Sequence, residues 1–186
     1  MIEITSETIE RVETLLSGIP KGAERAFSNS INRGLSRVKT TAMKRAKEVY
    51  AVQSSALTAA TTTRISKAST GNIAGYVSFS GFKLPLYKFN VTPKKPGTGK
   101  QVTASVMKNG GTTFEDAFVA EMKNGHMGVF ERSGRKRLPV EEIMGLSAAQ
   151  MVGNAAVIEE LEKEAQKVVD ERLSHEIDRI LNGYGG

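Results

Sequence analysis

The chain has 186 residues, a formal net charge of +6, no cysteine and no tryptophan. This length suffices for one domain with a buried core, and the lack of cysteine excludes disulfides and thiolate chemistry. No apolar run approaches the roughly 20 residues that a membrane-spanning helix needs, and the N-terminus lacks a signal-peptide pattern. We expect a single domain with a helical part at 1–52, a β-rich middle at 53–140 and a C-terminal helix and tail at 141–186.

Charge is unevenly distributed along the chain. Residues 1–100 carry 16 Lys/Arg and 6 Asp/Glu, whereas residues 101–186 carry 10 Lys/Arg and 14 Asp/Glu. A basic half and an acidic half permit head-to-tail attraction between copies, and a basic face also permits contact with nucleic acid. Solvated helix faces explain the same pattern, so composition leaves these interpretations open.

Two helices are predicted in the first fifty residues. A short one begins near Thr5 or Ser6 and ends before Gly18. A longer one runs from about Lys21 to Tyr50, because apolar residues recur there at three- and four-residue spacing. This apolar stripe comprises Ala23, Phe27, Ile31, Leu35, Val38, Ala42, Ala46 and Val49. The cations that lie mostly off it include Arg25, Arg33, Arg37, Lys44 and Arg45. One face of the helix is therefore expected to pack, and the rest to be cationic.

The middle of the chain predicts four to six short antiparallel strands. The candidate strands are 62–66, 73–79, 85–89, 102–106, 118–122 and 127–130. Asn124-Gly125 is one of the strongest short signals for a hairpin turn. Between the strands, Val91 to Lys100 is rich in proline and glycine and predicts a loop that carries Lys94 and Lys95.

The last forty residues predict helix again. Glu141 and Glu142 suit the first turn of a short helix after Pro139, where acids favour the helix dipole. From a cap at Ser147, one apolar stripe continues to residue 182 and predicts a helix of roughly 50 Å. That length exceeds what a small sheet covers, so we expect part of it to pack on a neighbour. The fold class is therefore α+β, a small antiparallel sheet with a long N-terminal helix and a long C-terminal helix.

The residues offer no constellation for catalysis. His126 and His175 lack a nucleophile, carboxylate or second ligand at a spacing typical of a triad or a metal site. Gly97-Thr98-Gly99-Lys100 resembles the end of a phosphate loop, but the earlier glycine and the following Ser/Thr are missing. We expect no enzyme activity, no cofactor and no metal.

Specific function is instead expected at a basic turn. An apolar strand end at Val129-Phe130 runs into four cations around Gly134, and the chain leaves through Leu138-Pro139. The cations are Arg132, Arg135, Lys136 and Arg137. They suit carboxylates of a protein partner or DNA phosphates contacted without sequence reading. An alternative function is a nucleic-acid-binding accessory protein that uses the basic N-terminal helix, which has cations but no aromatics for stacking.

The span from Met127 to Val152 resembles the signature of the phage minor tail protein Z family. The matching residues are Gly128-Val129-Phe130, Arg132, Gly134, Arg137-Leu138-Pro139, Gly145-Leu146-Ser147 and Gln150-Met151. Gly145-Leu146-Ser147 departs from the Gly-Pro-Ser turn expected there. The layout is also similar over nearly the whole chain, with a basic helix, a β-rich middle and a long C-terminal helix.

The resemblance implies a structural virion protein, assembled in the bacterial host cytoplasm, that completes the head-proximal end of the tail and enables head–tail joining. Copies would form a ring, sixfold beside a sixfold tail, around the channel through which double-stranded DNA passes. Expected partners are other copies, the tail terminator or tail tube, head-connector proteins and non-specific DNA, with no membrane. The turn with Leu138 and Pro139 would plug into an adjoining ring, or its cations would line the channel.

Overall fold

The computed structural model describes residues 4–183 and has mixed α+β architecture. The α-helices are α1 (Ser6–Leu15), α2 (Gly22–Val49), α3 (Ser54–Ala59), α4 (Ala148–Val152) and α5 (Ala155–Leu181), with a 3-10 turn, η1, at Leu86–Lys88. The strands are β1 (Thr62–Ser66), β2 (Tyr76–Ser80), β3 (Lys83–Pro85), β4 (Asn90–Thr92), β5 (Val102–Ser105), β6 (Thr112–Phe114), β7 (Phe118–Glu121), β8 (Met127–Arg132), β9 (Val140–Glu142) and β10 (Met144–Ser147). These strands form antiparallel sheets of two or three, ordered β1-β2, β10-β3, β4-β5-β6 and β7-β8-β9. No helix in the described part of the chain is both long and apolar enough to cross a bilayer.

The chain folds into two compact units. The helical unit contains Met1–Ala42, Thr63–Ser78 and Ala155–Gly186, and the sheet unit contains Met43–Thr62 and Phe79–Asn154. Helix α2 runs through the boundary between them. The expectation of one domain stays a prediction.

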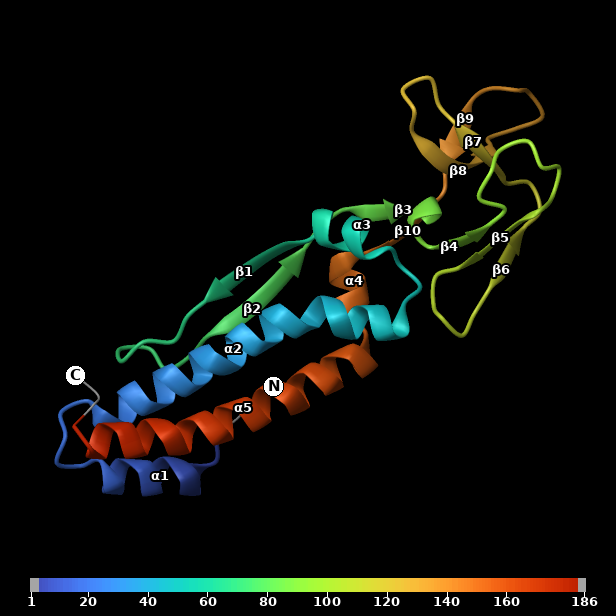
Figure 1. Cartoon of the computed structure of the whole chain (residues 1–186). Coiled ribbons are helices and arrows are strands. Elements are labelled where there is room, and N and C mark those ends of the chain that lie inside the picture. The colour runs from blue at the N-terminus through green and yellow to red at the C-terminus, as the bar shows by residue number, and fades with distance from the viewer. Residues whose placement is uncertain (1–3, 184–186) are drawn as a thin grey trace. The chain divides into compact units, whose positions relative to one another are not determined.

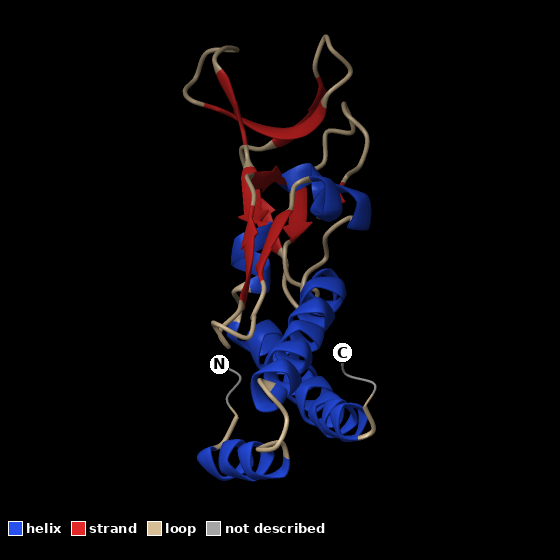
Figure 2. Cartoon of the chain, turned by 90° about the vertical axis from the view of Figure 1, so that its left-hand side faces the viewer, coloured by secondary structure: helices blue, strands red, loops and turns tan. Residues whose placement is uncertain are grey.

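In the helical unit, α2 and α5 lie side by side, as Figures 1 and 2 show. Their close approach depends on Gly34, since a Cβ built there would lie 2.6 Å from Cγ2 of Val169. Helix α1 adds to the same core, where Val12 and Leu16 pack with Phe27, Leu173 and Ile180. Burial of each such aliphatic side chain stabilises the fold by about 1.5–3 kcal/mol. The hydroxyl of Thr5 accepts a hydrogen bond from the Thr8 amide and so caps α1 at one of the two predicted residues.

The segment that carries β1 and β2 packs on another side of α2. The Asn32 side chain donates to the Ala68 carbonyl and accepts from the Ala68 amide, both at 2.9 Å. A Cβ at Gly75 would lie 2.7 Å from Cδ1 of Leu35. Helix α2 is therefore contacted on two sides within the helical unit, which accounts for the burial of its small residues Ala26 and Ser30.

The sheet unit is tied together by backbone hydrogen bonds. Tyr50, just after α2, pairs with Met107, two residues after β5, in an isolated β-bridge. Strand β8 is the centre of its sheet, with Val119 opposite Val129 on one side and Glu142 opposite Phe130 on the other. A capping box between Ser147 and Gln150 starts α4, as the cap signal at Ser147 predicts.

The predicted fold class is confirmed, and several local expectations are corrected. The strands are distributed over several small sheets, more than four to six in all. Residues 86–88 form a 3-10 turn instead of strand, because Pro85 is followed by a hydrogen bond from the Phe89 amide to the Leu86 carbonyl. The predicted helix at Glu141 and Glu142 is wrong, since both lie in β9.

The predicted C-terminal helix from Ser147 is divided into two. Gly153 terminates α4 by donating to the Ala149 carbonyl, and α5 begins at Ala155. The single apolar stripe therefore belongs to different cores, with Met151 in the sheet unit and Val157 in the helical unit.

Candidate protein and nucleic-acid interfaces

The predicted basic turn is the loop between β8 and β9. Register across its base pairs Arg132 with Val140. The loop is held at its start, where the Ser133 hydroxyl donates to Oε1 of Glu141 at 2.7 Å. All of residues 131–139 are exposed, and Leu138 has 67% of its surface accessible. The chain thus presents an apolar side chain and several cations on one projecting loop.

Arg132 differs from the other cations of this loop. Its guanidinium carbon lies 4.6 Å from the centroid of the Phe118 ring, a cation–π contact that fixes it against β7. Arg135, Lys136 and Arg137 form no ion pair within residues 4–183. Their charge is uncompensated locally and available to a partner.

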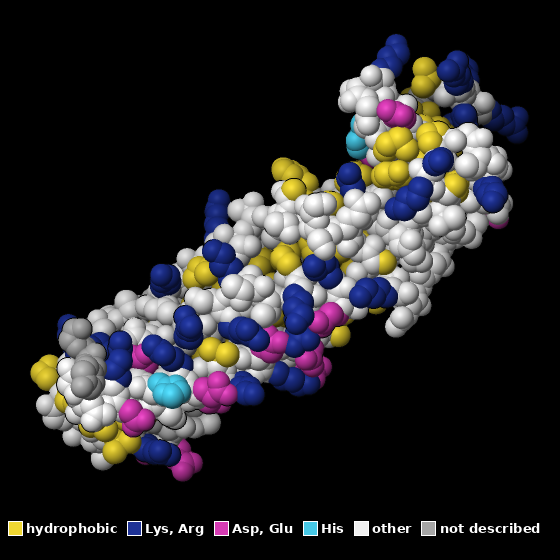
Figure 3. Space-filling model, viewed as in Figure 1, with side chains coloured by type: hydrophobic (Ala, Val, Ile, Leu, Met, Phe, Trp, Pro, Cys, Tyr) yellow, Lys and Arg dark blue, Asp and Glu magenta, His cyan; other side chains and the backbone are white. Residues whose placement is uncertain are grey.

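A second basic loop lies beside the first. It joins β4 to β5 and contains the predicted cations Lys94 and Lys95, together with Lys100. Lys95, Lys100 and Arg132 line one open hollow of about 390 Å³, together with Glu115 and Phe118. We call these two loops, residues 93–101 and 132–139, the basic tip. Figure 3 shows Lys and Arg side chains gathered with hydrophobic ones over the end of the sheet unit that holds β7, β8 and β9.

Lys94 is anchored within the tip. Its ammonium donates to the Phe89 carbonyl at 3.3 Å and lies 5.2 Å from the centroid of the Tyr87 ring. The Tyr87 hydroxyl in turn donates to the Lys94 carbonyl at 3.0 Å. The loop base is therefore fixed, and Lys94, Lys95 and Lys100 are all exposed cations of this loop.

A contact that the sequence did not predict lies in the same sheet. His126 Nε2 and Glu142 Oε1 are 2.7 Å apart, and both side chains are partly exposed. The His126 ring also meets the Phe130 ring edge-on at 6.4 Å. Sixteen residues separate the two partners, so only the pairing of β8 with β9 brings them together. The contact ties the β7–β8 hairpin to β9 and supports the base of the tip.

The predicted cations of α2 do not form one surface. Arg37 pairs with Glu164 of α5 at 3.3 Å, and Arg45 pairs with Glu48 on its own helix at 2.8 Å. Arg25, Arg33 and Lys44 make no ion pair among the described residues. The division at Ala42 also places Lys44 and Arg45 in the sheet unit and the other three in the helical unit.

Helix α5 buries most of its apolar face within the chain. Its residues Val157, Leu161, Ala165, Val169 and Leu173 are each at most 5% exposed. Ile158 and Leu181 of the same stripe remain 40% and 51% exposed, so the expectation that part of it packs on a neighbour stays a prediction. The uneven charge of the sequence suggested that basic and acidic parts of different copies attract each other. In the structure the basic helix α2 and the acidic helix α5 pair within one chain.

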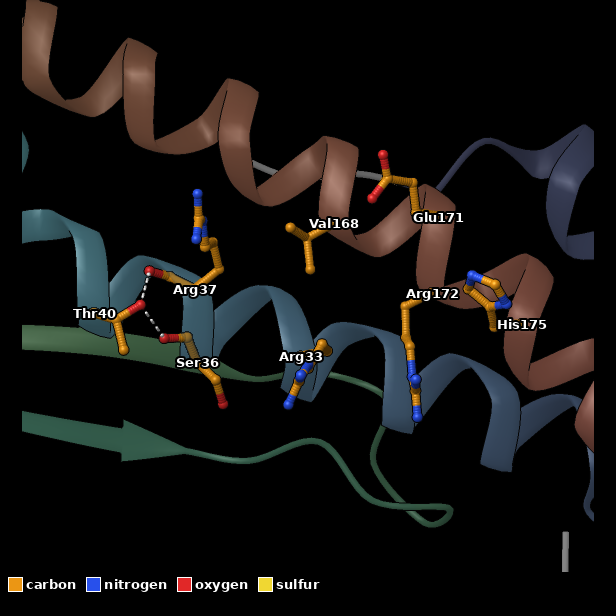
Figure 4. A pocket seen from close by; sticks show the side chains of 8 residues that line it. All are labelled: Arg33, Ser36, Arg37, Thr40, Val168, Glu171, Arg172 and His175. Atoms are coloured by element: carbon orange, nitrogen blue, oxygen red, sulfur yellow. Dashed lines mark hydrogen bonds between the residues drawn. The ribbon is translucent and has the colours of Figure 1, made fainter.

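An open groove of about 460 Å³ lies between α2 and α5 (Figure 4). It is lined by Arg33, Ser36, Arg37, Thr40, Val168, Glu171, Arg172 and His175. In Figure 4 the side chains of Arg33 and Arg172 extend to the same side from the two helices, whereas Arg37 turns toward α5. The sequence predicted an exposed cationic role for Arg33 and Arg37. It predicted no such role for Arg172 and His175, which lie on the acidic C-terminal helix.

One turn after Arg172, Glu176 is a buried carboxylate with 1% of its surface exposed. Its oxygens form an ion pair with Arg172 at 2.7 Å and accept hydrogen bonds from Arg179 at 2.6 Å and from the Asn29 side-chain amide at 3.0 Å. This network fixes Arg172 and links α5 to α2.

Within residues 4–183 no three His, Cys, Asp or Glu side chains gather as a metal site would require.

Comparison with known proteins identifies the family. The family model described as prophage minor tail protein Z (GPZ) matches residues 8–184, which is nearly the whole chain. No curated protein and no solved structure was found to match. The match agrees with the resemblance of residues 127–152, whose basic turn joins β8 to β9 and whose Ser147 cap lies at the end of β10, before α4. The chain belongs to the prophage minor tail protein Z family, whose members are structural proteins of the phage tail.

Proposed function

We propose that this protein completes the head-proximal end of the tail and enables head–tail joining, as a structural and not a catalytic component. The basic tip is the observation that carries the proposal. Its exposed cations have no ion pairs among the described residues, and the exposed Leu138 lies among them. Charged groups around an apolar anchor are typical of a protein-docking surface.

The copies are proposed to form a ring around the DNA channel, sixfold where the tail is sixfold. A ring requires heterologous interfaces, in which one surface meets a different surface of the next copy. The sheet unit holds 14 Lys/Arg and 7 Asp/Glu, whereas the helical unit holds 12 and 13. The two units therefore present different charge, which supports such an interface. Tail terminator or tube proteins and head-connector proteins are the proposed further partners.

The basic tip, with Leu138 and Pro139 at its projecting loop, is proposed to dock on one of these proteins. Arg135 and Arg137 would pair with carboxylates there, and such charge-assisted hydrogen bonds are about twice as strong as neutral ones. Lys94 and Lys95 lie in the neighbouring loop and would extend the same contact. Virion location at the tail end or neck follows from this proposal.

Complementation of a deletion phage tests the proposal. Without the protein, electron microscopy should show full heads and unjoined tails. The variant Arg135→Glu with Arg137→Glu should fail to restore joining, while the control Lys108→Glu with Lys123→Glu should restore it. The control residues are exposed cations of the same unit outside the tip, so both variants carry the same change of charge. Joined particles from the tip variant would refute the docking role.

A further inference from the structure

We infer that the groove between α2 and α5 binds the phosphodiester backbone of double-stranded DNA without reading its sequence. This inference rests on the proposed function in naming DNA as the polyanion that the protein meets. It assigns to Arg33, Arg172 and His175 a ligand distinct from that of the basic tip.

The lining of the groove is suited to an anion. Three of its side chains are guanidiniums, and Glu171 is its only carboxylate, so the lining side chains carry an excess of positive charge even with His175 neutral, although Glu164 and Glu176 offset two of the guanidiniums. A guanidinium presents five N–H donors in a rigid fork that fits phosphate oxygens in pairs. Arg33 and His175 have no hydrogen bond or ion pair within residues 4–183 and are free to bind.

Two of the guanidiniums are held in place. Arg37 is fixed by Glu164, and Arg172 is fixed by the buried Glu176. Their side chains nevertheless remain 49% and 41% exposed, so each is partly accessible from solvent. Because these side chains are already ordered, binding an anion there costs less side-chain entropy than binding it with free surface cations.

The groove lacks what a protein partner needs. Val168 is its only apolar side chain, and no aromatic residue or methionine lines it, although these side chains are enriched at the centres of protein interfaces. The basic tip, in contrast, has Leu138 and Phe118. A polar cationic groove instead suits a hydrated polyanion with a repeating negative charge.

The same lining predicts the absence of base recognition. The Ser36 and Thr40 hydroxyls donate to backbone carbonyls of their own helix, those of Asn32 and of Ser36 and Arg37. No aromatic ring is present for stacking of bases. Contacts to phosphate position a protein on DNA but carry no sequence information, so binding should be independent of sequence.

Fluorescence anisotropy with a labelled duplex of mixed sequence tests the inference over a series of salt concentrations. Arg33→Glu is the test variant, because it breaks no ion pair among the described residues. Lys39→Glu is the control, since Lys39 is an exposed cation of the same helix that does not line the groove. Arg33→Glu should weaken binding at low salt by roughly tenfold or more and lower the slope of log K against log salt by about 1. Lys39→Glu should change affinity by less than about threefold and leave the slope unchanged.

Several results would overturn the inference. The inference fails if the wild-type protein does not bind the duplex, or if the two variants lose affinity equally. It also fails if poly-glutamate displaces the duplex at equal charge concentration. Arg33→Gln removes the positive charge without introducing a negative one. This variant and the melting temperature of each variant test whether a loss of DNA affinity comes from misfolding. Joining is scored separately: if the Arg135→Glu, Arg137→Glu variant still joins heads to tails while Arg33→Glu loses DNA binding, docking at the tip fails and the groove stands.

Discussion

Gly34 provides a direct test of how α2 and α5 pack. Replacement of a mid-helix glycine by alanine stabilises an isolated helix by about 1 kcal/mol. Here the added Cβ would lie 2.6 Å from Cγ2 of Val169 and 3.4 Å from the Ala165 carbonyl oxygen. Val169 is 1% exposed and, as a β-branched residue, has one strongly preferred rotamer in a helix. The methyl cannot move aside easily, and such overpacking costs about 1–3 kcal/mol.

The net expectation for Gly34→Ala is therefore a loss of up to about 2 kcal/mol, since helix propensity offsets part of the overlap. Urea unfolding followed by circular dichroism measures it, with Ser36→Ala on the exposed side of α2 as the control, expected within about 0.5 kcal/mol of wild type. The double variant Gly34→Ala, Val169→Ala should be more stable than the sum of the single changes predicts, because the clash is removed. A gain of about 1 kcal/mol for Gly34→Ala alone would refute the close packing and leave only helix propensity.

Further predictions concern the buried carboxylate, one exposed pair and the two units. Glu176→Gln should destabilise the protein by about 1–3 kcal/mol in urea unfolding, since hydrogen bonds to charged partners are lost; an unchanged midpoint would contradict the network at Glu176. A hydrogen bond from Lys163 lowers the pKa of Glu159, and the same bond raises the pKa of Lys163. The Glu159 contribution to stability is therefore present above pH 4.5 and lost as pH falls through the lowered pKa, whereas that of Lys163 is present below pH 10.5 and lost at higher pH. Carboxyl NMR titration should show the pKa of Glu159 rising in Lys163→Gln, and no change would refute the pair. Because α2 runs through both units, we expect one calorimetric unfolding transition, and two resolved transitions would contradict the single-domain prediction.

Local signals in the sequence predicted the elements that depend on local chemistry. The cap at Thr5, the hairpin at Asn124-Gly125 and the cap at Ser147 each need only a few neighbouring residues, and each is found where predicted. The long helices were predicted because their apolar residues recur at helical spacing over many turns, a signal that a short segment does not give. The basic turn was located correctly after the strand at 127–130, because the apolar pattern ends there, but the strand β9 that follows the turn was predicted as helix.

Features that depend on distant segments could not be predicted. Burial of Ser30 and Gly34 follows from contact of α2 with two sets of neighbours, and hydropathy does not mark such small or polar residues as core. The strand character of Glu141 and Glu142 is fixed by pairing with β8, which overrides their preference for a first helical turn. Arg172 and His175 belong to a groove whose other wall is more than 130 residues earlier in the sequence, so no spacing within α5 indicates their role.

The folded arrangement of charge changes what the composition implied about assembly. The basic and acidic halves of the sequence suggested that opposite charges meet between copies, but Arg37 and Glu164 meet within one chain. By residue count the helical unit is nearly neutral, whereas the sheet unit holds twice as many Lys/Arg as Asp/Glu. Cations that matter for docking must therefore be sought on the sheet unit, where the basic tip combines them with exposed Leu138. The cations that remain on α2 and α5 form a polar groove instead. The apolar content of each surface, more than its charge, distinguishes a protein partner from a phosphate backbone.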